Sequence, residues 1–539
     1  SSKLIGHNIL GYDIPAIESI TGISLSSIKA VDTLVLSRLF HPTREGGHGL
    51  ESWGYRLGFK KGSYGSSEGA WDSYSPEMLQ YCINDVQLNE KVYSRLKSES
   101  RGFTGQAVQL EHSVAKIIDQ QRRTGFLLNQ KKCMLLVAEL QEKIEQVQSE
   151  VHETFKPKII KNVLVPKYTK SGTTAKTAVN SEGNGVRLTE KEYDTIREHG
   201  KVTRTTVIDF NLASRKQIGE YLVEFGWKPK NRTPTGQPIV DEGTLNKVKN
   251  IPEAAMIAKY LMLQKRLAQI KSWLKEVDDN TDRVHGYVNP NGAVTSRMTH
   301  SHPNMAQIPS SKSPYGPECR SCWTVPKGYK LVGIDASGLE LRMLAHEMND
   351  EAYTNEILNG DIHTANQKLA GLESRNQAKT FIYALNYGAG DAKLGSVVGG
   401  NREAGKRLRE RFFSSLPSFK TLKDRVSREA ASGSIKALDG RKLTVRSEHA
   451  ALNTLLQGNG AIVMKQALIY LDNKIKSKGI DAKFVANVHD EWQLEVKEDQ
   501  ADAVGRLGVQ ALRETTCTFK LNCPLDGEYN VGDNWYETH

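Results

Sequence analysis

The chain has 539 residues, of which 38% are hydrophobic and 25% are charged, and its formal net charge is +11. At about 150 residues per domain, this length predicts three or four domains, and the composition excludes disordered and fibrous proteins. No segment approaches the ~20 consecutive apolar residues of a membrane span, and the first ten residues lack the features of a signal peptide. We therefore expect a soluble cytoplasmic protein whose natural partner is a polyanion.

The cysteines carry little information about function. The six cysteines include one CxxC pair, Cys319 and Cys322, and no second pair that would complete a zinc site. This usage favours a reducing compartment over a disulfide framework.

In chain order, residues 1–100 alternate short apolar runs with helical patterns, which predicts an α/β unit, and residues 106–155 have long helical periodicity. From Pro157 to about Phe210 the periodicity fades, and the window 158–180 contains lysines and no acid. This composition predicts a loop-rich insertion or a flexible arm. Helical patterns return where Ser214 is placed to cap a helix, continue over 251–277 and give way to mixed strands and helices over 284–539.

Two acids follow apolar strands in this last part. In KLVGIDASG a strand leads to Asp335, and in FVANVHDEWQLEV one strand runs into His489, Asp490 and Glu491 before another leaves. A single acid of this kind is commonly a turn residue. Two such acids in a basic protein can converge to hold two Mg²⁺ ions about 4 Å apart, which activate a hydroxyl and neutralise phosphoryl charge.

The segment RNQAKTFIYALNYG carries the most informative pattern. Arg375, Lys379, Tyr383 and Tyr387 recur at every fourth position, so on a helix each step turns by only about 40° and the four form one slanted stripe. Two cations followed by two aromatic rings would meet a triphosphate first and then a sugar and a base. For this helix alone, the alternative is that the aromatic rings belong to a core and the cations are solvated.

Together these segments resemble the family A DNA polymerases, which are the DNA polymerase I-like enzymes. DASGLELR, GDIHT, RxxxKxxxYxxxYG and VHDE occur in the family's order and spacing, and VNPNGAVTSRMTHSHPNMAQIP and LDGRK are similar to the T7-type phage replicative branch. The resemblance runs from about residue 3 to residue 539. It implies a DNA-directed DNA polymerase that adds dNTPs to a primer 3′-hydroxyl by two-metal phosphoryl transfer, in phage DNA replication and in the host cytoplasm.

The resemblance also implies a role for each residue of the motifs. The ligands of two Mg²⁺ ions, for which Mn²⁺ can substitute, would be the catalytic residues Asp335 and Asp490 and the carbonyl of Ala336. The residues that bind the dNTP would be His363, Arg375 and Lys379 at the triphosphate, Tyr383 near the 3′ position, and Glu340 with Tyr387 where a 2′-hydroxyl would lie. The DNA-binding residues would be Arg297 and Gln457 in the minor groove, and Asn453, His489 and Glu491 near the primer end or the metals. Tyrosine at position 383 implies tolerance of dideoxynucleotides.

The first hundred residues resemble the family's 3′–5′ exonuclease domain, which has a ribonuclease H-like fold. HNILGYD supplies Asn8, Tyr12 and Asp13, and YCINDV supplies Tyr81 and Asp85. The family's first exonuclease motif, a D-x-E pair upstream of Asp13, would lie before Ser1. Since two metal ions need several anionic oxygens between them, we expect a truncated and inactive exonuclease domain.

The segment 157–210 interrupts the region that corresponds to the polymerase thumb. In the T7-type branch, a basic insertion at this place binds host thioredoxin and raises processivity, but the insertion here is shorter and differs in sequence. Two interpretations follow: a processivity factor binds it, or its lysines contact DNA phosphates directly.

The expected fold is a mixed α/β, multidomain, right-hand polymerase with an antiparallel palm sheet. Its expected parts are a partial exonuclease domain (1–105), a thumb (106–283) with the insertion at about 157–210, a palm (284–354 and 441–539) and fingers (355–440). A single-subunit RNA polymerase shares the two-aspartate palm, but Glu340 and the DASGLELR segment argue against it. A catalytically idle DNA-binding protein is disfavoured by the intact Asp335, Asp490, Arg375 and Lys379.

Overall fold

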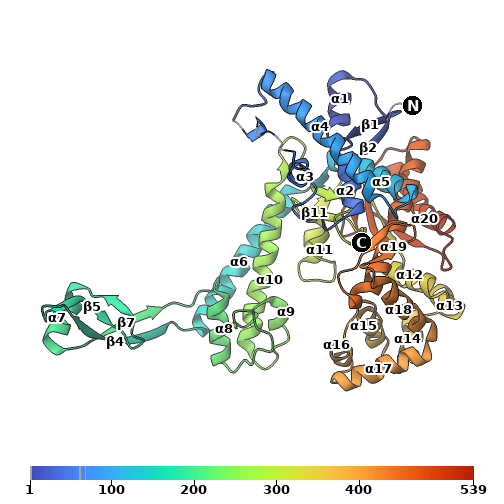
Figure 1. The fold of residues 1–539 in the computed structure, drawn as a ribbon. Helices are drawn as coiled ribbons and strands as arrows, with labels where there is room; N and C mark the ends of the chain where they lie inside the picture. Colours follow the sequence, from blue (N-terminus) through green and yellow to red (C-terminus); the bar gives the residue numbers. More distant parts are fainter. Residues whose placement is uncertain (1–2, 60–61, 63, 67) are drawn as a thin grey trace. The chain divides into compact units, whose positions relative to one another are not determined.

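The structure is a computed structural model that describes residues 3–59, 62, 64–66 and 68–539. The chain forms two compact units, Ser1–Gln130 with Ser272–His539, and Lys131–Lys271 (Figure 1). Within the described ranges no helix is long and apolar enough to cross a membrane. The described residues include all six cysteines, and none of these forms a disulfide.

The first unit begins with a small α/β part, as the sequence predicts. Strands β1 (Lys3–Gly6) and β2 (Lys29–Asp32) pair in parallel, and the helices are α1 (Asp13–Thr21), α2 (Thr33–Phe40), α3 (Leu50–Leu57), η1 (Tyr64–Ser66) and α4 (Pro76–Glu99). Trp53 and Leu88 lie in a core that α2, α3 and α4 enclose. This core holds α4, which carries Tyr81 and Asp85.

An antiparallel sheet lies at the centre of the first unit. Its order is β16 (Ala482–Val488), β17 (Glu491–Lys497), β13 (Tyr329–Ala336) and β18 (Gly527–Gly532). Leu331–Ile334 are all buried, because helices cover the sheet and a strand buried on both sides needs a continuous apolar run. Helices α5 (Gly105–Thr124) and α20 (Ala501–Thr518) contact the sheet, α19 (Ala451–Ser477) packs against both of them, and α12 (Leu339–Met348) packs against α19.

A helical part follows α12 in the chain. It contains α13 (Glu351–Asn359), α14 (Ile362–Ala370), α15 (Arg375–Asn386), α16 (Asp391–Ser396), α17 (Arg402–Ser415) and α18 (Pro417–Ala430), and it ends in the hairpin of β14 (Ser434–Lys436) and β15 (Lys442–Thr444). Helix α15 begins at a capping box in which the Ser374 hydroxyl accepts from the Gln377 amide and the Gln377 side chain accepts from the Ser374 amide. The sequence prediction of a helix over this segment is confirmed.

Smaller elements complete the first unit. A second sheet has the order β12 (Trp323–Thr324), β3 (Phe126–Leu128), β9 (Arg283–Val284) and β8 (Val277–Asp278), and β10 (Tyr287–Asn289) pairs with β11 (Thr299–Ser301). The remaining short helices are η2 (Met305–Gln307), α11 (Gly316–Arg320), η3 (Glu448–Ala450) and η4 (Glu498–Gln500).

The second unit contains α6 (Gln130–Thr154), α8 (Arg215–Glu224), α9 (Glu242–Leu245) and most of α10 (Pro252–Lys275). The Ser214 hydroxyl caps α8 by accepting from the Gln217 amide at 3.3 Å, which confirms the sequence prediction. Between α6 and α8 the chain forms a separate sheet with one helix (Figure 1). Its elements are β4 (Lys158–Tyr168), β5 (Thr174–Val179), β6 (Gly185–Arg187), α7 (Glu190–His199) and β7 (Val202–Ile208).

The prediction of a loop-rich insertion or flexible arm was therefore wrong. The four strands form an antiparallel sheet in the order β6-β5-β4-β7, with a small core of Leu164, Ala178, Leu188 and Ile196. The lysines of KIIKNVLVPKY interrupt a run rich in Ile and Val, residues that favour strands. The lack of acids over 158–180 therefore reflects the solvated residues of a folded sheet, and it does not indicate a disordered segment.

Candidate active site

The two strand-end acids lie at the same edge of the central sheet. Asp335 pairs in register with Glu491 on the neighbouring strand, and the Ala336 amide donates to the Asp490 carbonyl at 3.0 Å. His489 and Asp490 form the two-residue turn between β16 and β17, and His489 has a φ of 57°, as such hairpin turns require. The sequence prediction that each acid lies at a strand end is confirmed, since Asp335 is the last residue but one of β13 and Asp490 lies in the turn after β16, and antiparallel pairing brings them together.

These acids repel one another. Burial, followed by the negative charges of Asp490 and Glu491, raises the pKa of Asp335 to about 7, and burial also raises the pKa of Asp490. Asp335 nevertheless remains accessible to solvent. A divalent cation would relieve this repulsion, so the donor set fits the metal that the sequence implies.

Glu491 differs from its two neighbours because the protein already satisfies it. Its buried carboxylate accepts from Trp535 Nε1 at 2.5 Å and from Gln493 Nε2 at 2.6 Å, and it pairs with His539 Nδ1 at 2.8 Å. Burial alone would raise the pKa of Glu491, but the hydrogen bond and charge of His539 and the two other donors lower it. Sequence reasoning missed all three partners, since nothing in the local pattern around them points to Glu491.

Within the parts of the chain that the structure describes, no group of three or more His, Cys, Asp and Glu side chains could hold a metal ion. A metal at Asp335 and Asp490 would therefore need other ligands, such as carbonyl oxygens, water or a substrate. The Ala336 carbonyl remains a predicted ligand.

Helix α15 presents the predicted stripe on its outer side. Arg375, Lys379 and Tyr387 are exposed and Tyr383 is half-buried, whereas Ala378, Phe381, Ile382 and Leu385 form the buried side. The Tyr383 ring centroid lies 6.5 Å from that of Tyr387 and 6.4 Å from that of His363 on α14. The alternative in which the two tyrosines belong to a core is wrong for the exposed Tyr387, whereas the half-buried Tyr383 packs against the core of the unit, and His363 joins the stripe.

The cations of the stripe have a partner that the sequence analysis missed. The Asp361 carboxylate caps α14 and accepts from Arg375 Nε at 2.7 Å. The Arg375 hydrogen bond holds the pKa of Asp361 well below its usual range. Burial, then the positive charges of Arg375 and Lys379, lower the pKa of His363. Arg375 and Lys379 thus make a positive cluster that Asp361 partly neutralises, and the His363 imidazole lies beside it.

Glu340 connects the stripe to the central part of the unit. Its carboxylate accepts from Arg297 at 2.9 Å and from the Tyr387 hydroxyl at 3.2 Å, and Tyr387 also hydrogen-bonds Gln457 on α19. Burial raises the pKa of the Tyr383 hydroxyl, and the charges of Glu340 and Asp490 add to the shift. The structure therefore brings Arg297, Glu340, Tyr387 and Gln457 into one network near the two carboxylates.

Two predicted DNA-contacting residues lie outside this network. Asn453 is half-buried one turn before Gln457 on α19. His489 lies in the turn beside Asp490, where burial and then the Arg297 charge lower the pKa of its imidazole. Their predicted DNA contacts stay predictions.

The residues that resemble an exonuclease site are spread over two helices. Asp13 begins α1 and Asp85 lies within α4, where the Tyr81 ring packs at 5.8 Å from the Trp71 ring. Burial raises the pKa of Asp13. The nearby Asp32 is buried and its carboxylate accepts from the backbone amides of Asn8, Leu10 and Leu34 at 2.9–3.1 Å.

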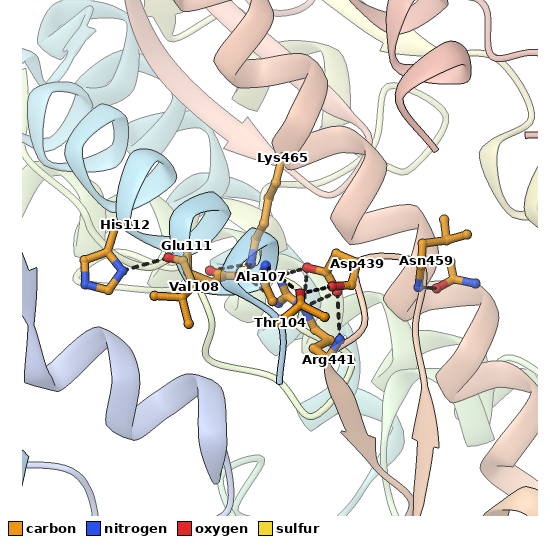
Figure 2. A network of polar contacts seen from close by, with 10 residues as sticks. Thr104, Ala107, Val108, Glu111, His112, Asp439, Arg441, Asn459 and Lys465 are labelled. Carbon is orange, nitrogen blue, oxygen red and sulfur yellow. Dashed lines mark hydrogen bonds and ion pairs between the residues drawn. The ribbon is translucent and has the colours of Figure 1, made fainter. Parts of the chain in front are cut away.

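A buried charge network contacts α19 through Lys465, and the sequence analysis did not predict it. Figure 2 shows Glu111 of α5 between Arg441, next to β15, and Lys465 of α19. Lys465 donates to Glu111 at 2.7 and 2.9 Å, and Arg441 also binds Asp439 at 2.6–3.0 Å. All four side chains are at most 2% exposed. The network joins α5, the β14–β15 hairpin and the helix that carries Asn453 and Gln457.

Comparison with known proteins identifies the class. Residues 186–537 match DNA polymerase family A. The DNA-directed DNA polymerases of Enterobacteria phage T3 and Escherichia phage T7 are each 34% identical to the chain over alignments that cover 99% of this chain and 92% of the relative. The POL domain of Pol1 from M. smegmatis, solved in complex with DNA primer-template and dNTP, has a TM-score of 0.77 at 19% identity and covers 99% of this chain and 86% of that chain.

The chain therefore belongs to DNA polymerase family A, with T7-type phage relatives. It has the right-hand polymerase fold, and it is a DNA-directed DNA polymerase. The predicted family, the right-hand polymerase fold and the enzyme class are confirmed.

Proposed function

We propose that the chain extends a primer along a template in phage DNA replication, by attack of the primer 3′-hydroxyl on the α-phosphorus of a dNTP with release of pyrophosphate. The observation that carries this proposal is that the stripe of α15 lies beside both Glu340 and the carboxylate Asp490. The cationic and aromatic stripe of α15 contacts Glu340 through Tyr387, and the charge of Asp490 reaches Tyr383 on the same stripe. A triphosphate on the stripe would thus have its reacting end near the carboxylates.

Asp335, Asp490 and the Ala336 carbonyl are the proposed ligands of two Mg²⁺ ions, for which Mn²⁺ can substitute. Bound there, the ions would lower the pKa of the attacking hydroxyl and neutralise the developing phosphoryl charge. Burial, followed by the charges of Asp490 and Glu491, raises the pKa of Asp335 to about 7, and this strained pair of carboxylates supports the assignment.

The remaining roles follow from charge and position. Arg375, Lys379 and His363 bind the triphosphate, and Arg375 exchanges the Asp361 carboxylate for a phosphate when the nucleotide enters. Glu340 and Tyr387 close the space beside the sugar where a 2′-hydroxyl would lie. Arg297 and Gln457, which both contact this pair, donate to minor-groove acceptors of the new base pair.

The parts of the right hand are proposed as well. The central sheet with Asp335 and Asp490 is the palm, α13 to α18 are the fingers, and α6, α8 and α10 form the thumb. The expected thumb began at residue 106, but α5 packs against α19 and β16 and lies in the unit that contains the palm.

The experiment that tests the proposed function compares Asp335→Asn and Asp490→Asn with Glu528→Gln. Glu528 faces Asp335 from the other neighbouring strand, so the control removes an adjacent negative charge without touching a proposed metal ligand. We expect both Asn variants to lose primer extension while binding primer-template DNA, and the control to retain activity. Extension by either Asn variant within tenfold of the unmodified chain would contradict the assignment.

We also propose that Asp13 and Asp85 do not support 3′–5′ hydrolysis by themselves. Asp32 is not proposed as a third metal ligand, because three backbone amides already donate to its carboxylate. Release of nucleotides from a 3′-labelled single strand, compared with that by an Asp13→Ala/Asp85→Ala variant, measures this activity. Degradation that the double variant loses would refute the proposal.

A further inference from the structure

The sheet of the insertion has one covered face and one open face. The buried residues Leu164 and Ala178 pack with Ile196 of α7, so α7 covers the face on which they lie. Val202 faces Leu164 across the ladder, and Val186 faces Ala178, which places both on this covered face. Side chains alternate between faces along a strand, so the neighbours of these residues point to the other side.

The open face is defined by strand residues that pair with one another in register or alternate with the covered set. They are Ile159, Lys161, Val163, Val165, Lys167, Thr177, Val179, Arg187, Thr203, Thr205 and Val207. Lys167 belongs here because its ammonium lies 3.4 Å from the position of a Cβ on Gly185, which pairs with Val179. All of these residues are exposed except Val179, which is partly exposed.

Charge is segregated between the two sides of the insertion. The open face carries three cations and no acid. The acids of residues 158–208, all of which the structure describes, lie elsewhere: Glu182 in the turn before β6, and Glu190, Glu192, Asp194 and Glu198 on α7. Arg204, on the covered side, pairs with Glu192 at 2.6 Å. The charged side chains of the open face are therefore all cations, and they lie among threonine hydroxyls and exposed Ile and Val side chains.

We propose that this open face binds the phosphodiester backbone of duplex DNA. The proposal rests on the proposed function, since it assumes that primer-template DNA is bound. Lys161, Lys167 and Arg187 pair with phosphates, and the hydroxyls of Thr177, Thr203 and Thr205 donate to phosphate oxygens.

The composition of the face favours DNA over a protein partner. Aromatic residues dominate the energetics of protein interfaces, and the open face has none. Its exposed Ile and Val residues have a structural reason, because β-branched side chains stabilise a ladder that one helix covers on one side only. A two-stranded ribbon such as the β4–β7 ladder also has dimensions that fit a groove of DNA.

The test compares two triple variants that lose the same charge. Lys161→Gln/Lys167→Gln/Arg187→Gln changes the open face. Lys170→Gln/Lys176→Gln/Lys191→Gln is the matched control, because its exposed lysines lie in a turn, on the covered side of β5 and on α7. Dissociation constants for a primer-template duplex are measured by fluorescence anisotropy from 50 to 300 mM NaCl, and thermal unfolding shows that both variants fold.

We expect the slope of log K against log salt to fall by about 2.7 in the open-face variant, since each phosphate contact contributes about 0.9, and to stay unchanged in the control. With a heparin trap that limits synthesis to one binding event, the open-face variant gives shorter products than the control. Equal slopes in the two variants would overturn the inference and leave a protein as the occupant of this face. Failure of the proposed function is distinguishable, because the unmodified chain itself would then not extend a primer.

Discussion

Replacement of Glu111 by glutamine tests whether the buried charge network holds the first unit together. Glu111 accepts every hydrogen bond that the structure gives the Lys465 ammonium, and it also accepts from Arg441. In Glu111→Gln, Arg441 keeps Asp439, but Lys465 is left as a buried cation without a carboxylate partner (Figure 2).

Loss of one partner from a buried ion pair costs about 3–5 kcal/mol, because the remaining charge is uncompensated. The unit that contains the network has about 400 residues, and unfolding entropy is about 2.1 cal/mol/K per residue, which gives about 0.8 kcal/mol/K. The melting temperature of this unit should therefore fall by about 4–6 °C at pH 7.

The pH dependence of this loss has a definite sign. Burial lowers the pKa of Lys465 to about 8 from its ordinary 10.5, although Glu111 opposes the shift. Between these values the unfolded chain binds more protons than the folded chain, so the contribution of this group to stability rises with pH. Without Glu111 the folded pKa falls further and the rise begins at lower pH. The deficit of Glu111→Gln should thus be largest below the folded pKa of Lys465 in the variant, shrink as the pH rises toward 8, and stay constant above pH 8, where Lys465 is neutral in both folded proteins.

The assay is thermal unfolding of the unmodified chain, Glu111→Gln, Lys465→Met and the double variant at pH 7 and pH 10. Since the double variant removes both charges together, it should recover most of the stability that Glu111→Gln loses. A shift of less than about 1 °C in Glu111→Gln, or a double variant as unstable as Glu111→Gln, would refute the reasoning.

Three further predictions concern the nucleotide. Tyr383→Phe should strongly raise discrimination against dideoxynucleotides, because it removes a hydroxyl near the 3′ position. Equal chain termination by both proteins at varied ddNTP:dNTP ratios would show that Tyr383 does not contact the sugar. Glu340→Ala should admit ribonucleotides more readily, since it removes the surface beside the 2′ carbon, and an unchanged rNTP to dNTP ratio would place the exclusion elsewhere. Asp361→Asn keeps the cap of α14 but frees Arg375, so the dNTP should bind up to about fivefold more tightly, which is the range expected for an exposed ion pair. Asp350→Asn, at the cap of α13, is the control for the third prediction, and unchanged dNTP affinity in Asp361→Asn would contradict it.

The sequence predicted those features that depend on local order. An apolar run that ends in an acid predicted the strand ends at Asp335 and Asp490, and a four-residue spacing predicted the face of α15. The cap at Ser214 was predicted for the same reason, because a capping residue and the amide that it accepts from are neighbours in the chain. These patterns are set by backbone periodicity, which tertiary contacts did not override here.

The features that the sequence did not predict depend on contacts between distant segments. Glu111 and Lys465 are separated by 354 positions, and Glu491 and Trp535 by 44, so no local pattern pairs them. The prediction for the insertion was wrong for a different reason. Its lysine content suggested a solvated arm, although the Ile and Val residues between the lysines favoured strands. A lysine-rich composition indicates that one side of a segment is solvated, but it does not show whether the other side packs into a hydrophobic core.

These distant contacts explain why carboxylates of similar chemistry have different roles at the site. Glu340 is paired with Arg297, and Glu491 is held by Trp535, Gln493 and His539, so the protein compensates both charges. Asp335 and Asp490 have raised pKa values, because burial outweighs the groups that lower them and the charge of a neighbouring carboxylate adds to each shift. A cation would therefore gain most at Asp335 and Asp490, and the VHDE segment contributes one proposed metal ligand although it contains two acids.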